Sequence, residues 1–560
     1  MAKIALVFAL QICLIFPLLA QTEDFLRIDR TNPNYSEGDW VSYSVNRWSK
    51  SLVIGMEYIY TATTGGIGRY NHYINKWDYP FTSSNGLSDN DIFILAYDMD
   101  TNYLWCVTTY SLSCYFSTFR RWENYYFDDI GLGAADEIIS IGFDDQSVWL
   151  ETASGNLLRG NKYGGYVYER VMTGRDDRNS SIRWFGYRDR FFGRAPNFFM
   201  SDGFFFDSDG FITDMRFNRY YVSSLKQDNW GAYWVTVKGL GLGKADVNIE
   251  QLEILDYGLF IEDVSAIALN EETNELWVGG LGEFEGRSGI TLWEIDNRQW
   301  SYYESRFITD LYSDQVTSIE VDGDYVWFGT TNGVARYERD TNDWRSYDVF
   351  SRLADNYVYD VETDSKNIWI ASAGGLTKMV KSSLDTDSLD VEQIMTDDLR
   401  RVSVLDIELM ENLVWLGTED GVYVYDTNKN IGGYHDEPGG PMNEIVYAIS
   451  RYENELWFAL ENGVEVFDVD RKVWLGPPQR RFYSGETVIS IVADEAVVWA
   501  GTNRGVLKYD RDRETWIQYT REDGLLSDMV NVILPDGDYV WFGTPRGLTR
   551  FYWNAPNRID

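Results

Sequence analysis

Several residue types are scarce in this chain, and each shortage excludes a class of protein. Its 560 residues include only three cysteines and two histidines, which excludes a disulfide-rich scaffold and leaves almost no material for histidine triads or multi-histidine metal sites. Lysine and arginine number 49 against 88 aspartates and glutamates, for a net charge of −39. Such a surface repels the phosphates of nucleic acids and anionic membranes. We therefore expect no nucleic-acid partner.

Long apolar runs are also missing, except at the N-terminus. Residues 4–19 are largely apolar, follow Lys3 and lead to Ala20 before a polar stretch. This order predicts a cleaved signal peptide over residues 1–20. An uncleaved anchor is the alternative, but the run is shorter than the roughly 20 residues that cross a bilayer. We expect an extracytoplasmic protein, in the periplasm, on the outer surface or secreted, with no transmembrane segment after cleavage.

Aromatic residues are abundant, at 16% of the chain, and they mark an internal repeat. The clearest copies read VWFGTTNGVARY, VWLGTEDGVYVY and VWFGTPRGLTRF. In each copy a glycine stands six residues after an anchor tryptophan, where it supplies the positive φ of a tight hairpin turn. The six pairs are Trp327 and Gly333, Trp369 and Gly375, Trp415 and Gly421, Trp457 and Gly463, Trp499 and Gly505, and Trp541 and Gly547.

Each copy predicts four strands. The anchor segment forms two strands around its turn, and a third alternating segment precedes it. A fourth follows it, marked by a second tryptophan seventeen residues after the anchor, as at Trp344, Trp474 and Trp516. Four strands in about 42 residues is the period of a β-propeller blade, and the alternation with period two excludes a helical solenoid.

Weaker copies continue the series toward the N-terminus. The copy at Trp277 has its later landmarks six residues late, which indicates an insertion between Gly280 and Ser288. The whole series predicts an all-β chain of about twelve four-stranded blades. The anchor positions of the weaker copies are Tyr60, Trp105, Trp149, a degenerate copy around Phe191, Trp234 and Trp277.

The segment from Gly524 to Arg550, which begins GLLSDMVNVI and continues through YVWFGT, resembles the bacterial two-component-regulator propeller repeat. The resemblance covers most of residues 40–553. In that family such repeats form extracytoplasmic sensor propellers, usually followed by a membrane span and a histidine kinase. Similar repeats occur in a propeller component of the type IX secretion system. The sequence runs to Asp560 without a span or a kinase, so the resemblance implies a sensor role only with a separate signalling partner.

Twelve blades exceed the roughly four to eight of one ring, so the sequence favours tandem β-propellers. The last copy ends after its third strand, whereas Trp40 lies in a strand with no blade before it. If Trp40 completes the sixth blade and Trp300 the twelfth, two six-bladed rings result, with a boundary near Asp296. The first propeller then covers residues 38–296, the second 297–553, and a short tail 554–560. A five-plus-seven split and a second ring inserted into the first stay open.

Two further expectations concern the hairpins. Cys106 and Cys114 flank a predicted turn in which Ser111 replaces the usual glycine, so a disulfide between them stays open. A cation stands nine residues after the anchor, as at Arg336 and Arg550. We expect it opposite the small residue two positions after the tryptophan, where it stacks on the indole. Because this set recurs in many blades, we interpret it as structural.

Candidate catalytic and metal sites are few. Asp98 and Asp100, like Asp207 and Asp209, have the oxygen spacing of calcium loops, but each pair stands where a blade needs a turn. We expect no cofactor, with calcium at these turns as the alternative. Two carboxylates on a propeller face would suffice for glycoside hydrolysis. Enzymatic activity therefore stays open, with the balance of the sequence against it.

One segment departs from the acidic character of the chain. Residues 174–194 hold six arginines among aromatic residues, and guanidinium groups suit carboxylate or phosphate ligands. The candidate ligand-binding set is Arg183, Arg188, Arg190 and Trp184. The competing interpretation, which we favour, is a degenerate blade whose arginines pair with neighbouring aspartates.

Together these patterns favour a secreted or periplasmic propeller protein that acts as a ligand-binding or protein-interaction scaffold in the bacterial cell envelope. A glycan, a peptide or an envelope protein would be its partner. One alternative is a polysaccharide-active enzyme, a glycoside hydrolase or lyase, on the same scaffold. The other is a sensor module for a separate signalling partner.

Overall fold

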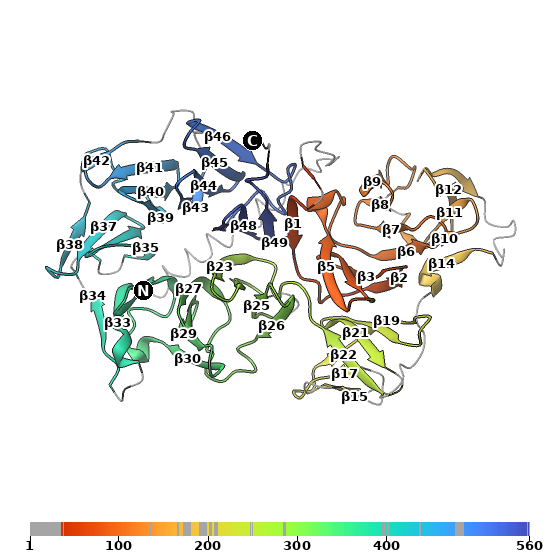
Figure 1. Ribbon diagram of the computed structural model, residues 1–560, viewed down its shortest axis with the longest axis horizontal. Helices are drawn as coiled ribbons and strands as arrows, with labels where there is room; N and C mark the ends of the chain where they lie inside the picture. Colours follow the sequence, from red (N-terminus) through yellow and green to blue (C-terminus); the bar gives the residue numbers. More distant parts are fainter. Residues whose placement is uncertain are drawn as a thin grey trace.

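The structure of the protein is a computed structural model. It describes residues 35–36, 38–133, 136–164, 167–171, 181–189, 199–200, 204–206, 211–246, 248, 250–283, 287–384, 386, 388–394, 396, 398–399, 402–435, 438–476, 486–556 and 558. The predicted signal peptide lies outside these residues. The described strands form twelve sheets, of which nine have four strands, two have five and one has three. Figure 1 shows them in two rings that lie side by side, which confirms the prediction of an all-β tandem propeller.

Helical structure in the described part is limited to short 3-10 turns. None of them is long and apolar enough to cross a membrane. The turns are η1 (Ser83–Asn85), η2 (Tyr187–Asp189), η3 (Val349–Ser351) and η4 (Lys381–Ser383).

Seven four-stranded sheets form the C-terminal ring. Their strands, sheet by sheet, are β23 (Val264–Asn270), β24 (Glu275–Gly280), β25 (Ile290–Glu294), β26 (Gln299–Tyr303); β27 (Val316–Asp322), β28 (Tyr325–Thr330), β29 (Gly333–Glu338), β30 (Asp343–Tyr347); β31 (Val358–Thr363), β32 (Asn367–Ser372), β33 (Gly375–Val380), β34 (Val391–Ile394); β35 (Val404–Met410), β36 (Leu413–Thr418), β37 (Gly421–Asp426), β38 (Ile431–Tyr434); β39 (Val446–Tyr452), β40 (Glu455–Leu460), β41 (Gly463–Asp468), β42 (Val473–Trp474); β43 (Val488–Ala493), β44 (Val497–Thr502), β45 (Gly505–Asp510), β46 (Thr515–Tyr519); and β47 (Val532–Asp536), β48 (Tyr539–Thr544), β49 (Gly547–Phe551) with β1 (Trp40–Tyr43). The first strand of each sheet contacts the first strand of the next, and β47 contacts β23. The ring is therefore closed.

The hairpin glycines behave as the sequence predicts. All six, including Gly333 and Gly547, have positive φ. A Cβ on Gly333 would lie 2.1 Å from the carbonyl oxygen of Tyr347, where the fourth strand ends. The turn thus needs glycine for its backbone conformation and for the close approach of the outer strand.

The anchor tryptophans form the cores between neighbouring sheets. Trp327, Trp499 and Trp541 have no exposed surface, and they pack among aliphatic residues of the next sheet. Several indoles also donate a hydrogen bond to the aspartate five residues earlier, as Trp369 does to Asp364 at 2.9 Å. Buried aromatic surface and a satisfied N–H together fix the sheet at its inner end.

The strand that completes the last sheet comes from the other end of the chain. β1 pairs antiparallel with β49, with Trp40 opposite Phe551 and Tyr43 opposite Leu548. The Trp40 indole stacks on the Phe551 ring at 3.9 Å between centroids. This confirms that the last copy takes its fourth strand from elsewhere.

The predicted division into two six-bladed rings is wrong. Trp40 belongs to the last sheet, and Trp300 lies in β26, opposite Trp293 of its own sheet. The insertion between β24 and β25 moves β26 further along the sequence than in the other copies. β26 is nevertheless the fourth strand of this sheet, so the sheet needs no strand from elsewhere. Asp296 lies in the turn between β25 and β26, so the change of ring comes before β23. The seven-bladed closure is one of the alternatives that the sequence leaves open.

The N-terminal ring has four complete sheets. Their strands are β2 (Ser51–Ile54), β3 (Tyr58–Thr63), β4 (Gly66–Asn71), β5 (Lys76–Phe81); β6 (Ile94–Asp98), β7 (Tyr103–Val107), β8 (Ser111–Phe116), β9 (Arg121–Tyr126); β10 (Ile138–Phe143), β11 (Ser147–Thr152), β12 (Leu157–Asn161), β13 (Val167–Val171); and β19 (Val222–Gln227), β20 (Tyr233–Val237), β21 (Gly241–Asp246), β22 (Gln251–Leu255). β2 contacts both β6 and β19, and β6 contacts β10. These contacts place the four sheets around a second axis.

Short strands occupy the remaining place in this ring. β14 (Arg183–Gly186) pairs with β10, and β15 (Phe199–Met200) pairs with β22. A small sheet joins β16 (Phe205–Phe206), β17 (Ile212–Thr213) and β18 (Arg219–Tyr220). The described residues between β13 and β19 therefore form no four-stranded blade, and Phe191, the centre of the expected degenerate copy, lies outside them.

An aromatic seam joins the two rings. The Trp77 ring of β5 stacks on Tyr257 at 4.3 Å, and Tyr257 contacts Trp300 of β26 at 5.7 Å between centroids. Trp300 in turn stacks on Trp293 at 4.7 Å. One buried cluster includes residues of both rings, so the rings share a core.

Two expectations about hairpins are settled by strand register. Cys106 lies opposite Ser113, whereas Cys114 lies opposite Trp105. The two cysteines therefore point to opposite faces of the sheet, and both are free and buried. The expected place of the cation is wrong, because Arg336 pairs directly with Trp327 rather than with Gly329.

The cations nevertheless stack on aromatic rings. The guanidinium of Arg336 lies 4.7 Å from the Tyr325 ring, and that of Arg550 lies 5.6 Å from the Trp541 indole. The structural interpretation is consistent with both contacts, although the ring that is covered differs between sheets.

Candidate functional site: the inner rim of the seven-bladed ring

Carboxyl groups gather on three neighbouring inner strands of the C-terminal ring. β31 and β35 each place two acidic residues at alternate positions, so that these side chains share one face of their strand, and β27 adds one at the matching position. All are half-buried. We call them the inner-rim carboxyl groups, and they are Glu320, Asp360, Glu362, Asp406 and Glu408.

These groups reach across the gap between neighbouring sheets. Asp360 Oδ2 accepts a hydrogen bond from the backbone N–H of Ile407 at 3.0 Å, and Asp406 Oδ2 accepts one from Ile449 at 2.6 Å. The Thr363 hydroxyl donates to Glu320 Oε1 at 3.1 Å. The first strand of a blade is an edge whose backbone groups lack a strand partner. The carboxyl groups satisfy some of these donors.

Burial changes the protonation of the inner-rim carboxyl groups. It raises the pKa of Glu320 and of Glu408 to about 7, and that of Asp360 to about 6. Burial, followed by repulsion from the neighbouring carboxylates, also holds the pKa of Glu362 well above its usual range. Burial likewise raises the pKa of Asp406. Several of these groups therefore titrate close to neutral pH.

The other inner strands lack these carboxyl groups at the matching positions. The positions that match Asp360 hold Ala448, Ser490, Val532 and Ala266 in the other sheets. The cations that lower the pKa of rim groups are Lys381 and Arg451. One side of the rim is therefore acidic. Sequence reasoning missed this asymmetry because each acid stands in a strand that was interpreted only as part of the repeat.

Of the predicted arginine set, Arg188 is paired with an acidic residue. Arg188 forms two hydrogen bonds with Glu151, at 2.6 and 2.7 Å, and its guanidinium lies 4.2 Å from the Trp184 ring. Arg183 is exposed on β14, with its guanidinium 5.4 Å from the Phe185 ring. Arg190 lies outside the described residues. Arg188 therefore has an acidic partner, but this partner is Glu151 of β11 rather than one of the neighbouring aspartates, of which Asp189 pairs with Lys226.

The other predicted chemical groups have local partners as well. The buried ammonium of Lys162 lies 3.3 Å from Asp98 and 2.8 Å from Asp100. Asp207 and Asp209 lie outside the described residues. His435 packs among aromatic rings, 4.6 Å from Phe467. In the part of the chain with described coordinates, no three His, Cys, Asp or Glu side chains are arranged to hold a metal ion.

A second feature is an exposed aromatic patch on the N-terminal ring. Trp230, in the turn between β19 and β20, and Tyr73, in the turn between β4 and β5, are 65% and 61% exposed. His72 lies between them, with ring centroids 4.4 Å from Tyr73 and 5.1 Å from Trp230. Met56 and Ile74 are also exposed. We call these five residues the turn patch.

Comparison with known proteins identifies the fold. No protein-family model matches the chain, and neither does any curated protein. Among solved structures, PorZ of Porphyromonas gingivalis, an essential surface component of the type IX secretion system, is similar at 14% identity. The match covers 92% of this chain and 87% of PorZ, with a TM-score of 0.56. The two chains share a fold.

Two further solved structures are extracellular domains assigned to hybrid two-component systems of B. thetaiotaomicron. One is 16% identical over 90% of this chain and 76% of that domain, with a TM-score of 0.47. The other is 18% identical over 94% and 76%, with a TM-score of 0.43. PorZ is described as a surface component, and these two domains are described as extracellular.

Proposed function

We propose that this protein is an extracytoplasmic scaffold that binds a glycan, a peptide or an envelope protein at the cell envelope. The observation that carries the proposal is the turn patch, which presents large aromatic rings to solvent on adjacent blades. Aromatic residues are enriched in binding surfaces, and contiguous exposed apolar side chains mark interaction sites. The surface location of proteins with this fold supports an extracytoplasmic site of action.

Both turns of the patch are held in place before any partner arrives. Asp228 accepts hydrogen bonds at 2.9 Å from the backbone N–H groups of Trp230 and Ala232 and from the Trp234 indole. Asn71 Oδ1 accepts from the backbone N–H of Tyr73 at 3.1 Å. Rigid aromatic side chains lose little conformational entropy on binding. The patch is therefore suited to recognition.

The test compares wild-type protein with the double variant Tyr73→Ala/Trp230→Ala. Binding to immobilised envelope glycans and to solubilised outer-membrane proteins is measured by surface plasmon resonance. We expect at least a tenfold loss of affinity in the double variant. Phe350→Ala is the matched control, because Phe350 is 92% exposed on the other ring and should leave binding unchanged. Equal affinity of all three proteins would contradict the proposal.

The inner-rim carboxyl groups favour a second candidate, a polysaccharide-active enzyme. A glycosidase needs one carboxyl group that stays protonated near neutral pH beside one that is ionised, and Glu320 with its raised pKa fits the first role. Turnover on a polysaccharide panel, abolished by Glu320→Gln or Glu362→Gln in folded protein, would establish this activity. Absence of turnover by the wild type would leave the binding scaffold as the function.

A further inference from the structure

A buried arginine stands at the junction of the two rings. Residues 44–49 connect β1, in the C-terminal ring, to β2, in the N-terminal ring, and are mostly buried. Arg47 in this connection is 8% exposed. Its guanidinium is sandwiched between two rings, 4.4 Å from Phe260 and 4.7 Å from Tyr302.

Arg47 differs from the other buried cations in its lack of a polar partner. Its guanidinium makes no hydrogen bond and no ion pair with any described residue, and its Nε is fully enclosed. By contrast, buried Lys162 binds two aspartates, and Arg336 lies 3.9 Å from Glu338. Burying a cation without an anion or a hydrogen-bond acceptor costs several kcal/mol. Cation–π contacts offset only part of this penalty.

The surrounding charges do not supply the missing partner. Glu304 is buried, and its two oxygens already bind Arg287 at 2.6 Å and Arg306 at 2.7 Å. Asp314 accepts hydrogen bonds from the Ser288 hydroxyl and the Ser305 backbone. Each acid here is therefore committed to other donors.

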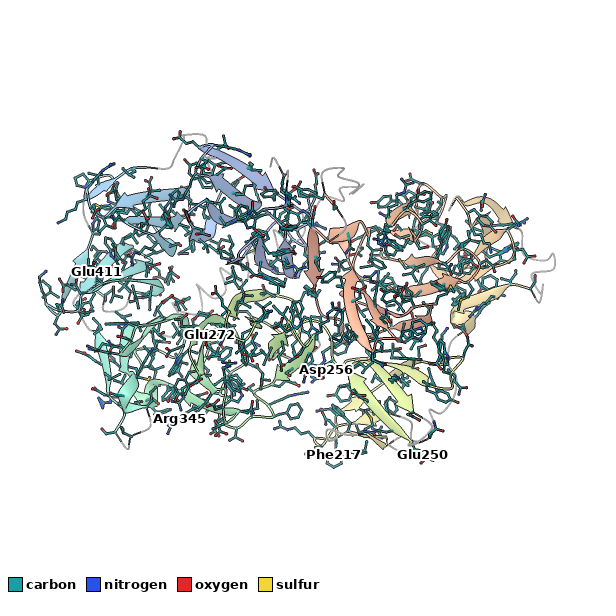
Figure 2. All side chains as sticks on the ribbon, in the orientation of Figure 1. Phe217, Glu250, Asp256, Glu272, Arg345 and Glu411 are labelled. Atoms are coloured by element: carbon teal, nitrogen blue, oxygen red, sulfur yellow. The ribbon has the colours of Figure 1, made fainter. Side chains whose placement is uncertain are left out.

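Two further charges complete the local field. Arg287 adds to the positive potential, because burial and then this neighbouring guanidinium lower the pKa of Arg47. Asp256 is exposed at the junction (Figure 2), and its negative charge raises the pKa of Arg47, which offsets part of this positive potential. Among the described residues the Arg47 guanidinium has no hydrogen-bond acceptor, and an oxyanion would supply one.

We infer that the ring junction is a binding site for an oxyanion, which Arg47 holds with its planar guanidinium. An arginine fork donates two parallel hydrogen bonds to a carboxylate or a phosphate, and such charge-assisted bonds strengthen in a buried setting. Arg287 would add long-range attraction while it stays paired with Glu304. The ligand is either the carboxylate of an acidic sugar or peptide, or a phosphate group. This site is separate from the turn patch and goes beyond the proposed function.

The test measures thermal stability of the full chain in sodium chloride, sodium acetate and sodium phosphate at matched ionic strength and pH 7. A ligand that binds only the folded state raises Tm in proportion to its occupancy. We expect acetate or phosphate to raise the wild-type Tm by a few degrees over chloride, and the larger shift identifies the ligand class. Arg345→Met is the control, because Arg345 is exposed on β30, away from the junction (Figure 2), and it should keep the full shift.

Arg47→Met gives the decisive comparison. It removes an unpaired buried charge, so we expect a higher Tm than wild type in chloride and no additional shift in acetate or phosphate. A lower Tm in chloride, or an anion shift equal to that of the wild type, would overturn the inference, as would a wild type that responds to neither anion. If Arg47→Met fails to fold, Arg47→Lys replaces it in titration calorimetry with phosphate and acetate. At least tenfold weaker binding supports the site, and equal binding rejects it.

Discussion

The two rings are built from the same repeat, but only one of them is regular. In the C-terminal ring six hairpins keep their glycine at positive φ, and most neighbouring sheets enclose a compact buried cluster of their own. In the N-terminal ring the β7–β8 turn has Ser111 in place of glycine. There the buried hydroxyls of Ser111 and Ser113 form hydrogen bonds with each other and with the half-buried Ser88, with Ser111 to Ser88 at 2.6 Å. The hairpin turn can therefore lose its glycine where other side chains form hydrogen bonds with its polar groups.

Closure also differs between the rings. The C-terminal ring is sealed by β1, which is held through four residue pairs with β49. In the described part of the N-terminal ring, β2 contacts β6 on one side and β19 on the other. Between the sheets of β10 and β19, the short strand β14 pairs with β10. Side-chain contacts join β19 to the segment around β14. Lys226 of β19 pairs with Asp189, and its ammonium lies 5.3 Å from the Phe185 ring.

The largest effect should come from removal of β1. Deletion of residues 38–43 exposes Phe551 and Leu548 and removes the burial of Trp40, Val41 and Tyr43, which is worth about 1.5–3 kcal/mol for each side chain. We expect the C-terminal ring to lose most of its stability in calorimetry. A peptide of residues 36–46 added in trans should restore part of it by strand addition. A deletion variant that melts like the wild type would refute closure by β1.

The next effect concerns the seam that joins the rings. Tyr257→Ala removes the ring between Trp77 and Trp300, and a large-to-small change of a buried aromatic costs about 3–5 kcal/mol. Because the shared core then weakens, we expect one calorimetric transition to separate into two, with the irregular N-terminal ring melting first. Tyr552→Ala, at a ring pair away from the seam, should leave a single transition. An unsplit melt in Tyr257→Ala would mean that the rings are coupled elsewhere.

A smaller effect follows from the inner-rim carboxyl groups. A carboxyl group with a raised pKa binds its proton more tightly in the folded than in the unfolded chain, so its contribution to stability falls as pH rises. For Glu320 and Glu408 the loss spans the range from about pH 4.5 to about 7. We expect the C-terminal ring to lose on the order of 1–3 kcal/mol between pH 5 and 8.

The variant Glu320→Gln/Glu362→Gln/Glu408→Gln should flatten this pH dependence, because glutamine stays neutral. Chemical denaturation at several pH values measures it. Stability that rises from pH 5 to 8 in the wild type would contradict the assigned protonation, and an equal slope in the variant would place its source elsewhere.

The smallest effect should come from Arg188→Gln on the N-terminal ring. Its ion pair with Glu151 is partly exposed, and such pairs contribute about 1 kcal/mol or less. We therefore expect a small loss of stability that shrinks at high salt. A loss of several kcal/mol would show that Arg188 holds β14 in place.

The repeat can be predicted from the sequence because the residues that define each blade lie close together along the chain. Trp327 and Gly333 lie in one hairpin, and the forces that place them act within a dozen residues. Ring closure is harder to predict, because Trp40 and Phe551 are far apart in the sequence and meet only in the folded chain. The sequence pattern does not distinguish between the blades that lack a fourth strand. The inner-rim acids and Arg47 were missed for the same reason. Their neighbours, such as Ile407 and Phe260, come from other blades.

Disulfide trapping of β1 tests the account most directly. Ser42 lies opposite Thr549, with their hydroxyls 2.8 Å apart, so Ser42→Cys/Thr549→Cys should form an intramolecular disulfide on mild oxidation in a chain whose three native cysteines are replaced. Peptide mapping should then link the two strands. Ser42→Cys/Thr291→Cys, which would pair if β1 completed the sheet of β23–β26, should not cross-link. A disulfide in the second variant and none in the first would contradict closure of the seven-bladed ring by β1.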